Sequence, residues 1–158
     1  MKKVFLLGGL FLLVLAACSK KDDTPSYDAL AQYRIDSTKI VAYAAANNIT
    51  NLQHDSLGIF YQIVTRGESD SVKGAASVNV AYIGSFLDKK VFDSSYNANF
   101  DLNRVIPGWT IGIPKIGKGG EINLFLPSYF AYGPQGQGSI PGNTVLVFNV
   151  KLKDFTNK

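Results

Sequence analysis

Few side chains in this sequence have the types and spacing that acid–base, covalent or metal chemistry requires. The 158 residues include one histidine, His54, and one cysteine, Cys18. Nucleophile triads and zinc sites both need partners that are missing here. The glycine-rich segment GKGGE (117–121) lacks the Lys-Ser/Thr ending of a phosphate-binding loop. We expect His54 to be solvated. We predict no cofactor and no metal, so any reaction catalysed by this chain must proceed without a metal, a cofactor or a nucleophilic side chain.

An apolar binding surface is the chemistry that the sequence does offer. The only tryptophan, Trp109, ends the segment VIPGW (105–109). A tryptophan usually belongs to the core, and its ring can also form the floor of a site. Tyr132 is different, because it lies in the Gly/Pro-rich segment AYGPQG (131–136), where core packing is a poor explanation for a tyrosine. Loops of this kind often carry functional residues. We interpret Tyr132 as a site residue and leave both interpretations of Trp109 open.

The N-terminus indicates an exported protein. In residues 1–17, two lysines precede an apolar stretch that is too short to span a bilayer comfortably, which is typical of a signal peptide. The segment LAAC (15–18) resembles the lipobox of bacterial lipoproteins, in which the peptidase cuts before the cysteine and the cysteine is acylated. We predict lipidation of Cys18, which would anchor the protein to a membrane. The alternative is an ordinary signal peptide with a chance cysteine.

Residues 18–26 are polar and are expected to form a flexible tether. Ser19 after the cysteine resembles the sorting signal of Gram-negative lipoproteins that reach the outer membrane. The cluster KKDD (20–23) resembles a surface-export tag of Bacteroidetes lipoproteins, although so short a charged run is more often a solvated linker. We therefore expect a Bacteroidetes-like, lipid-anchored protein of the outer membrane, facing the periplasm or the cell surface.

The charge of the chain gives little support to a nucleic-acid partner. The net charge of +4 includes Lys2 and Lys3, so the chain without its signal peptide carries about +2. No long basic stripe remains.

The elements that must position these residues are mainly strands. Apolar residues alternate in residues 57–67, 77–86, 121–127 and 145–155, which predicts four or five strands. A short helix is expected at Trp109, begun by Pro107 and limited by Gly112 and Pro114. Before the strands, residues 27–50 have helical spacing, as one long helix or as two with Asp36 capping the second, and Asn47-Asn48 is a plausible stop. The sequence thus predicts an α+β fold in which an antiparallel sheet curls over one short helix, with a helical N-terminal extension.

Four segments in this order resemble an FKBP-type peptidyl-prolyl cis-trans isomerase: VNVAYIG (78–84), KKVFDSSY (89–96), VIPGW (105–109) and the long segment 126–152. The resemblance covers residues 57–155 and implies a five- or six-stranded antiparallel sheet wrapped around a short helix, with an apolar pocket between them. It further implies that Trp109 is the floor for a substrate proline. The backbone N–H of Ile106 and the Tyr132 hydroxyl would hold peptide carbonyls. The implied catalytic residues are Tyr82, Phe92, Asp93, Ile106, Trp109, Tyr132 and Phe148, and the implied substrate-binding residues are Phe100, Val105 and Ile140.

The sequence departs from the family pattern at the pocket. Ala98 stands where the family often has the aromatic residue that walls the pocket, and Phe100 takes the second aromatic position. No basic residue lies between Ser94 and Phe100 to pair with Asp93, so Arg104 is the candidate substitute. Gln137 and Ser139 also differ from common loop residues, so macrolide binding does not follow.

Three functions remain open at this point. The first is a prolyl isomerase that acts on proline-containing polypeptides. The second is a chaperone or adaptor of the same fold that binds such segments with little turnover. The third is a lipoprotein whose N-terminal helix does the work by dimerisation. The sequence leaves the oligomeric state undetermined.

Overall fold

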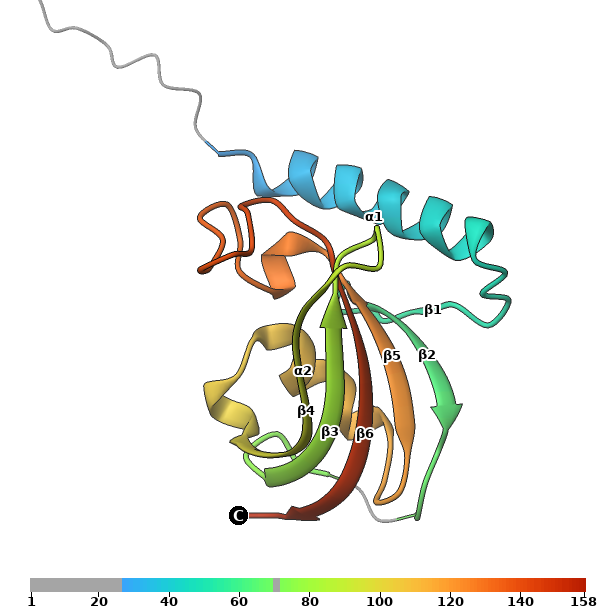
Figure 1. Ribbon diagram of the computed structural model, residues 1–158, viewed down its shortest axis with the longest axis vertical. Coiled ribbons are helices and arrows are strands. Elements are labelled where there is room, and N and C mark those ends of the chain that lie inside the picture. Colours follow the sequence, from blue (N-terminus) through green and yellow to red (C-terminus); the bar gives the residue numbers. More distant parts are fainter. Residues whose placement is uncertain (1–26, 70–71) are drawn as a thin grey trace, which may run out of the picture.

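The computed structural model describes residues 27–69 and 72–158. The predicted signal peptide, the lipidation site Cys18 and the tether up to residue 26 lie outside these residues. The described residues form one six-stranded sheet that curls around a short helix, with a longer helix across one end (Figure 1). Of the helices in residues 27–69 and 72–158, none has the length and apolar character needed to cross a membrane.

The sheet is antiparallel throughout, and its strands are not paired in chain order. The order is β1-β2-β5-β6-β3-β4. The strands are β1 (Gln53–His54), β2 (Phe60–Thr65), β3 (Ser77–Ser85), β4 (Val91–Asp101), β5 (Glu121–Leu126) and β6 (Leu146–Thr156). The last strand of the chain, β6, therefore lies inside the sheet between β5 and β3.

The predicted alternation is confirmed in the central strands. Val78 and Val80 of β3 are fully buried, and Phe148 of β6 is nearly so. The other residues expected to face the core from β5 and β6 are also fully buried, namely Ile122, Leu124, Leu126, Leu146, Val150 and Leu152. Leu57 was expected in the first strand but is 63% exposed, because it lies in a turn in which the N–H of Gly58 donates to the carbonyl of Asp55.

Strand β4 was not predicted from the pattern of the sequence. It is an edge strand, and it carries polar residues such as Ser94 and Asn97 where an inner strand would alternate apolar ones. One side of β4 has no partner strand, and most of its side chains are solvated. Its sequence therefore does not need to alternate apolar and polar residues. The six strands agree with the count that the family resemblance implied.

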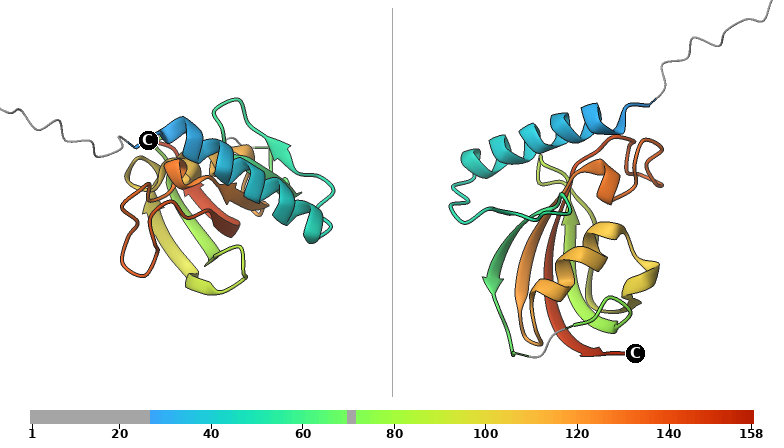
Figure 2. Two further views of the ribbon diagram at one scale, coloured as in Figure 1. Left: turned by 90° about the horizontal axis from the view of Figure 1, so that it is seen from above. Right: turned by 180° about the vertical axis from the view of Figure 1, so that it is seen from behind.

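The short helix α2 (Pro107–Gly112) lies against the concave face of the sheet, flanked by the 3₁₀ turns Leu102–Arg104 and Ile113–Lys115 (Figure 2). It approaches the sheet closely because two of its residues are glycines. A Cβ atom on Gly108 would lie 2.4 Å from Leu126, and one on Gly112 would lie 2.4 Å from Leu124. The main core fills the space between α2 and the sheet.

The N-terminal segment forms one continuous helix, α1 (Ala29–Ala46). The carboxylate of Asp28 caps its start by accepting from the N–H groups of Leu30 and Ala31, each at 3.0 Å. The helix ends at the expected asparagines, with Asn47 as the cap. Asp36 does not cap a second helix, which corrects that expectation: it is fully buried within α1.

Helix α1 lies across one end of the sheet, beside the turns that leave β5 and enter β6 (Figures 1 and 2). A second, smaller apolar cluster attaches it there, formed by Ile40, Phe60, Phe125 and Val145. The extension is thus packed onto the domain rather than held apart from it.

Candidate functional site

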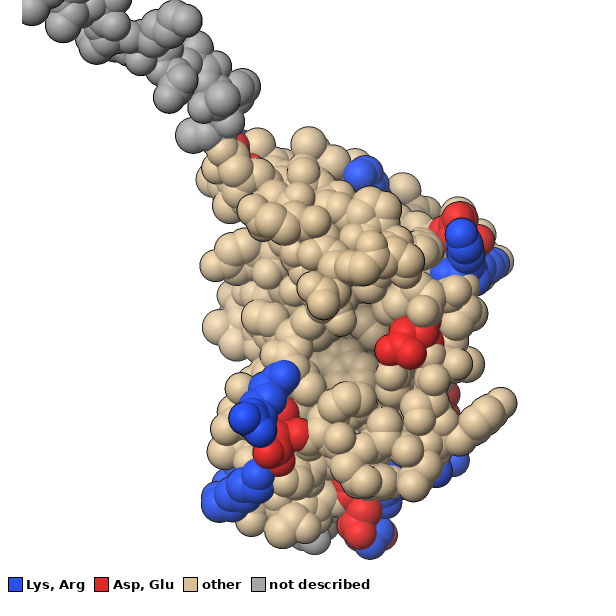
Figure 3. All heavy atoms as spheres, turned by 60° about the vertical axis from the view of Figure 1, so that its left-hand side comes forward, with Lys and Arg blue, Asp and Glu red and all other residues tan. Residues whose placement is uncertain are grey.

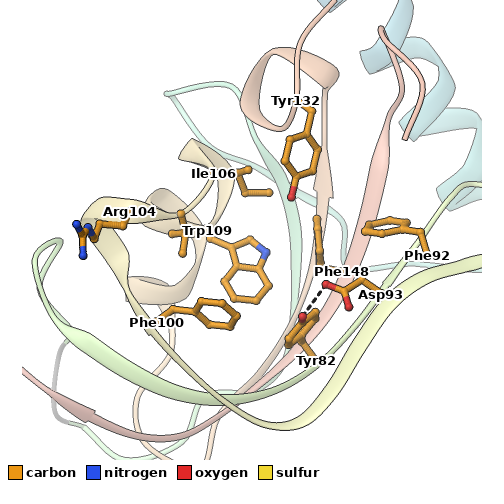
Figure 4. Close-up of a pocket in the computed structure, with 10 residues that line it drawn as sticks. Tyr82, Phe92, Asp93, Phe100, Arg104, Ile106, Trp109, Tyr132 and Phe148 are labelled. Atoms are coloured by element: carbon orange, nitrogen blue, oxygen red, sulfur yellow. Dashed lines mark hydrogen bonds between the residues drawn. The ribbon is translucent and has the colours of Figure 1, made fainter. Parts of the chain in front are cut away.

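A cavity of about 380 Å³ opens between α2 and the curled sheet. Figure 3 shows the hollow on this side of the molecule. Nine of the ten lining residues were named from the sequence as site residues, and the tenth, Arg104, was named as a possible partner of Asp93. The lining residues are Tyr82, Phe92, Asp93, Phe100, Arg104, Val105, Ile106, Trp109, Tyr132 and Phe148 (Figure 4). Residues from β3, β4, α2, β6 and two connecting segments thus meet in one place.

The floor of the cavity is an aromatic cluster centred on Trp109. Three rings meet its indole nearly at right angles: Tyr82 at 5.2 Å, Phe100 at 5.4 Å and Phe148 at 5.4 Å between ring centroids. Edge-to-face contacts of this kind stabilise by more than the buried area alone. Trp109 is only 4% exposed, so it is mainly a core residue that presents a small part of its ring to the cavity.

The indole N–H of Trp109 is buried and has no hydrogen-bond partner among the residues that the structure describes. Leaving a buried donor unpaired costs on the order of 1–3 kcal/mol. The surrounding rings supply no strong acceptor. The indole N–H is therefore a buried donor that lies among apolar rings.

One wall of the cavity depends on Gly84 of β3. The rings of Phe92 and Phe148 meet edge-to-face at 5.6 Å beside it, and Phe86 packs against Phe92 at 5.1 Å. A Cβ atom on Gly84 would lie 2.7 Å from the Phe92 ring and 2.9 Å from that of Phe148. Glycine is needed here because it leaves room for both rings.

Phe100 occupies the wall that the sequence left in doubt. Ala98 pairs with Val80 in the β3–β4 ladder and does not line the cavity. Phe100, two residues later, does line it and contacts both Trp109 and Tyr82. The second aromatic position of the motif therefore closes this side of the cavity.

Asp93 has a hydrogen-bond partner, but it is not the basic residue expected. The Tyr82 hydroxyl donates to its carboxylate at 2.7 Å. Burial, followed by this bond and the negative charge of Asp93, raises the pKa of Tyr82 to about 12. The Arg104 guanidinium points away from Asp93 (Figure 4), and no ion pair joins the two in the described part of the chain. Arg104 lines the cavity all the same, a position that its place directly before Val105 could have indicated.

Two donors at the rim are available to a ligand. The Tyr132 hydroxyl points into the cavity (Figure 4) and makes no hydrogen bond to another described residue. Burial first, and the nearby charge of Asp93 second, raise the pKa of Tyr132, so its hydroxyl stays a donor at neutral pH. The N–H of Ile106 likewise finds no backbone acceptor in the described residues, while its carbonyl accepts from Trp109.

One predicted placement is corrected by the structure. Ile140, expected to bind substrate, is only 8% exposed, belongs to the main core and is not among the residues that line the cavity. His54 is exposed, as expected, but it lies in strand β1 rather than in a loop. Its ring packs on Phe60 with 4.4 Å between centroids, and its Nε2 is 2.9 Å from the Tyr33 hydroxyl.

Comparison with known proteins agrees with this geometry. A family model described as FKBP-type peptidyl-prolyl cis-trans isomerase matches residues 68–153. The FKBP-type peptidyl-prolyl cis-trans isomerase FkpA of Escherichia coli is 45% identical over 103 residues, which are 63% of this chain and 38% of that protein. FkpA of Aeromonas hydrophila is 43% identical over 115 residues, covering 70% of this chain and 43% of that protein. This chain thus spans about two fifths of the length of these relatives.

Solved structures show the same fold. The crystal structure of Escherichia coli FkpA aligns with a TM-score of 0.68 and 33% identity, over 80% of this chain and 63% of that one. A peptidyl-prolyl cis-trans isomerase from Pseudomonas syringae aligns with a TM-score of 0.71 and 28% identity, over 83% of this chain and 98% of that one. The curled sheet and its short helix are shared features.

Proposed function

This chain belongs to the FKBP-type peptidyl-prolyl cis-trans isomerase family, and we propose that it accelerates rotation about peptide bonds that precede proline. The observation that carries the proposal is the cavity itself, which has an aromatic floor around Trp109. Two donors at its rim, the Tyr132 hydroxyl and the Ile106 N–H, have no partner in residues 27–69 and 72–158. The substrates proposed are proline-containing polypeptides in an extended or unfolded state.

The reaction needs a lower barrier and no new bond. Rotation about a peptide bond costs about 18–20 kcal/mol, because planarity preserves conjugation. Before proline the two isomers differ little in energy but interconvert over tens to hundreds of seconds. A catalyst therefore has to stabilise the twisted amide relative to the planar one.

The cavity has the properties for this differential stabilisation. In the twisted amide the nitrogen regains its lone pair and charge separation across the bond falls, so an apolar site disfavours the planar form more than the twisted one. The floor around Trp109 supplies that apolar surface. The rim donors would hold the carbonyl groups on either side of the bond, so that the chain turns about one bond only. A gain of ~10⁴ in rate asks for about 5.4 kcal/mol.

The test is isomerisation of a short prolyl peptide by the purified protein, followed optically against the uncatalysed reaction. Exchange between isomers faster than the control, and saturable with peptide, is the expected result. Peptide binding without a change in rate would instead assign the domain to the chaperone or adaptor function, and it would overturn the enzymatic proposal.

We further propose that the protein acts as a lipoprotein at the outer membrane of a Gram-negative, Bacteroidetes-like bacterium, anchored through Cys18. The support comes from the sequence of residues 1–26 alone. Replacing the cysteine, Cys18→Ala, is expected to move the protein from the detergent-phase fraction to the aqueous one. Unchanged partitioning of the variant would exclude the anchor without bearing on the isomerase.

A further inference from the structure

A buried carboxylate in α1 contacts the segment that carries Tyr132. Asp36 is fully buried and accepts three hydrogen bonds: from the side-chain amide of Gln32 at 2.8 Å, from the N–H of Ser128 at 2.8 Å and from the Ser128 hydroxyl at 2.6 Å. Burying a carboxylate is costly unless its oxygens are bonded in this way. Two of the three bonds cross 92 residues of sequence to one residue, Ser128.

Ser128 in turn holds the backbone on both sides of Tyr132. It begins the 3₁₀ turn Ser128–Phe130, and its carbonyl accepts from the N–H of Ala131 at 3.0 Å and from that of Gly133 at 2.8 Å. These amides directly precede and follow Tyr132. A set of hydrogen bonds therefore runs from the Asp36 carboxylate, through Ser128, to the N–H groups of the two residues on either side of Tyr132.

The attachment of α1 to the sheet does not by itself explain why a carboxylate, Asp36, is buried in this helix. The apolar cluster of Ile40, Phe60, Phe125 and Val145 already joins the helix to the sheet, and an apolar residue in place of a buried ionic group is often as stable or more so. The carboxylate fixes the orientation of Ser128, because it accepts from both the N–H and the hydroxyl of that residue. Asp36 also lies before the segment that the family model matches, so this contact is a property of the N-terminal extension.

We propose that Asp36 is a positioning residue for the isomerase site, acting through Ser128 to hold the Tyr132 hydroxyl at the rim of the cavity. The N-terminal helix is then a part of the active site's support rather than a spacer alone. This inference rests on the proposed isomerase function for its kinetic test, and it has a structural test that does not.

The kinetic test removes the carboxylate, Asp36→Ala, in the full chain. Both Ser128 donors bond to one oxygen of that carboxylate, so alanine leaves them without their acceptor. The Tyr132 ring then loses its fixed place, and kcat/KM for a prolyl peptide falls about tenfold, equivalent to about 1.4 kcal/mol. The matched control is Asp28→Ala, which removes the cap of the same helix without touching Ser128. An equal loss in the control, with both proteins folded at the assay temperature, would overturn the proposal.

A double-mutant cycle separates positioning from general damage. If Asp36 acts through the Tyr132 hydroxyl, the substitution Asp36→Ala lowers kcat/KM less than twofold when it is added to Tyr132→Phe, because the group to be positioned is already gone. The same tenfold loss in both backgrounds would show that Asp36 acts elsewhere, and the proposal would fail.

Amide hydrogen exchange tests the coupling whether or not the wild-type chain is active. The N–H groups of Ala131 and Gly133 are expected to exchange at least tenfold faster in Asp36→Ala, while those of β3 and β6 keep their protection. Ser128→Ala, which keeps the backbone donor and loses only the hydroxyl, provides a milder variant with the same pattern. Unchanged exchange at both amides in a folded variant would overturn the inference and leave the isomerase proposal intact.

Discussion

The floor and the rim of the cavity are built on different principles. The floor residues Tyr82, Trp109 and Phe148 lie on β3, α2 and β6, and each packs against another ring. The rim residues Ile106 and Tyr132 lie in connecting segments, and the N–H of Ile106 and the hydroxyl of Tyr132 have no partner among the described residues. The floor is therefore stabilised by the same contacts that stabilise the fold, whereas the rim is held by hydrogen bonds to its backbone. Substitutions in the floor should cost stability as well as activity, and those in the rim should cost activity alone.

The largest effect is expected from Trp109→Ala. Removing a ring that is 4% exposed and touches three others should lower the free energy of unfolding by about 3–5 kcal/mol, along with catalysis. Urea denaturation measures the change. Tyr96→Ala is the matched control, since this aromatic side chain is 91% exposed and its loss should stay within about 0.5 kcal/mol. A loss below about 1 kcal/mol for Trp109→Ala would remove the distinction between floor and rim.

Gly84→Ala should damage the wall by adding one methyl group. The new carbon would lie within 3 Å of the Phe92 and Phe148 rings, which must move apart, at a cost of about 1–3 kcal/mol. Thermal unfolding of this variant is compared with Gly74→Ala, where a Cβ atom meets nothing within 4 Å. Equal stability of the two variants would mean that the rings have room to spare.

Tyr132→Phe should separate the rim from the floor most cleanly. It deletes a hydroxyl that bonds to no other described residue, so the free energy of unfolding should change by less than about 0.5 kcal/mol. The kcat/KM for a prolyl peptide should fall about tenfold, because one donor to the substrate carbonyl is lost. The result that contradicts this expectation is full activity with lowered stability, which would make Tyr132 a packing residue.

The smallest effect concerns the pH dependence of stability. The pKa of Tyr82 is raised to about 12 in the folded state, above its unfolded value. Between these two values the unfolded chain binds fewer protons, so the contribution of Tyr82 is complete below the unfolded pKa and is lost as pH rises through about 12. Because the hydroxyl is partly screened by water, the difference is below about 1 kcal/mol.

The measurement is the slope of unfolding free energy against pH in alkaline solution, for wild type and for Tyr82→Phe. The variant should lose stability less steeply than wild type. Tyr96→Phe controls for the loss of a hydroxyl from an exposed ring. Parallel curves for wild type and Tyr82→Phe would show that burial and the bond to Asp93 do not raise the pKa of Tyr82 in solution.

The sequence predicted the floor well because its residues follow local rules. Apolar residues recur at every second position of the strands, as in Val80 and Tyr82 or in Phe148 and Val150. Pro107 marks the start of the helix that carries Trp109. The family motifs then placed these segments around one pocket. The polar edge strand β4 has no such period and was recognised only through its motif.

The support of the rim could not be predicted from the sequence. Nothing local indicates that Asp36 accepts from Ser128, because the contact depends on how α1 lies across the sheet. Asp36 was interpreted as a helix cap because it is a polar residue in a segment whose apolar spacing is uneven, and its burial also depends on how α1 lies across the sheet. Ile140 was misplaced because a family motif fixes its position along the chain but not the inward turn of its loop.

The position of β6 has a consequence for how the protein acquires its structure. The final strand of the chain pairs with both β5 and β3, so the two halves of the sheet cannot join until the last residues are available. Such long-range pairing is slow to form, typically milliseconds to seconds in domains of this kind. A chain that lacks Leu146–Thr156 would leave one edge of β5 and one edge of β3 unpaired and would remove the Phe148 ring from Trp109. Completion of this fold therefore depends on β6, and the cavity cannot form before that strand has been synthesised.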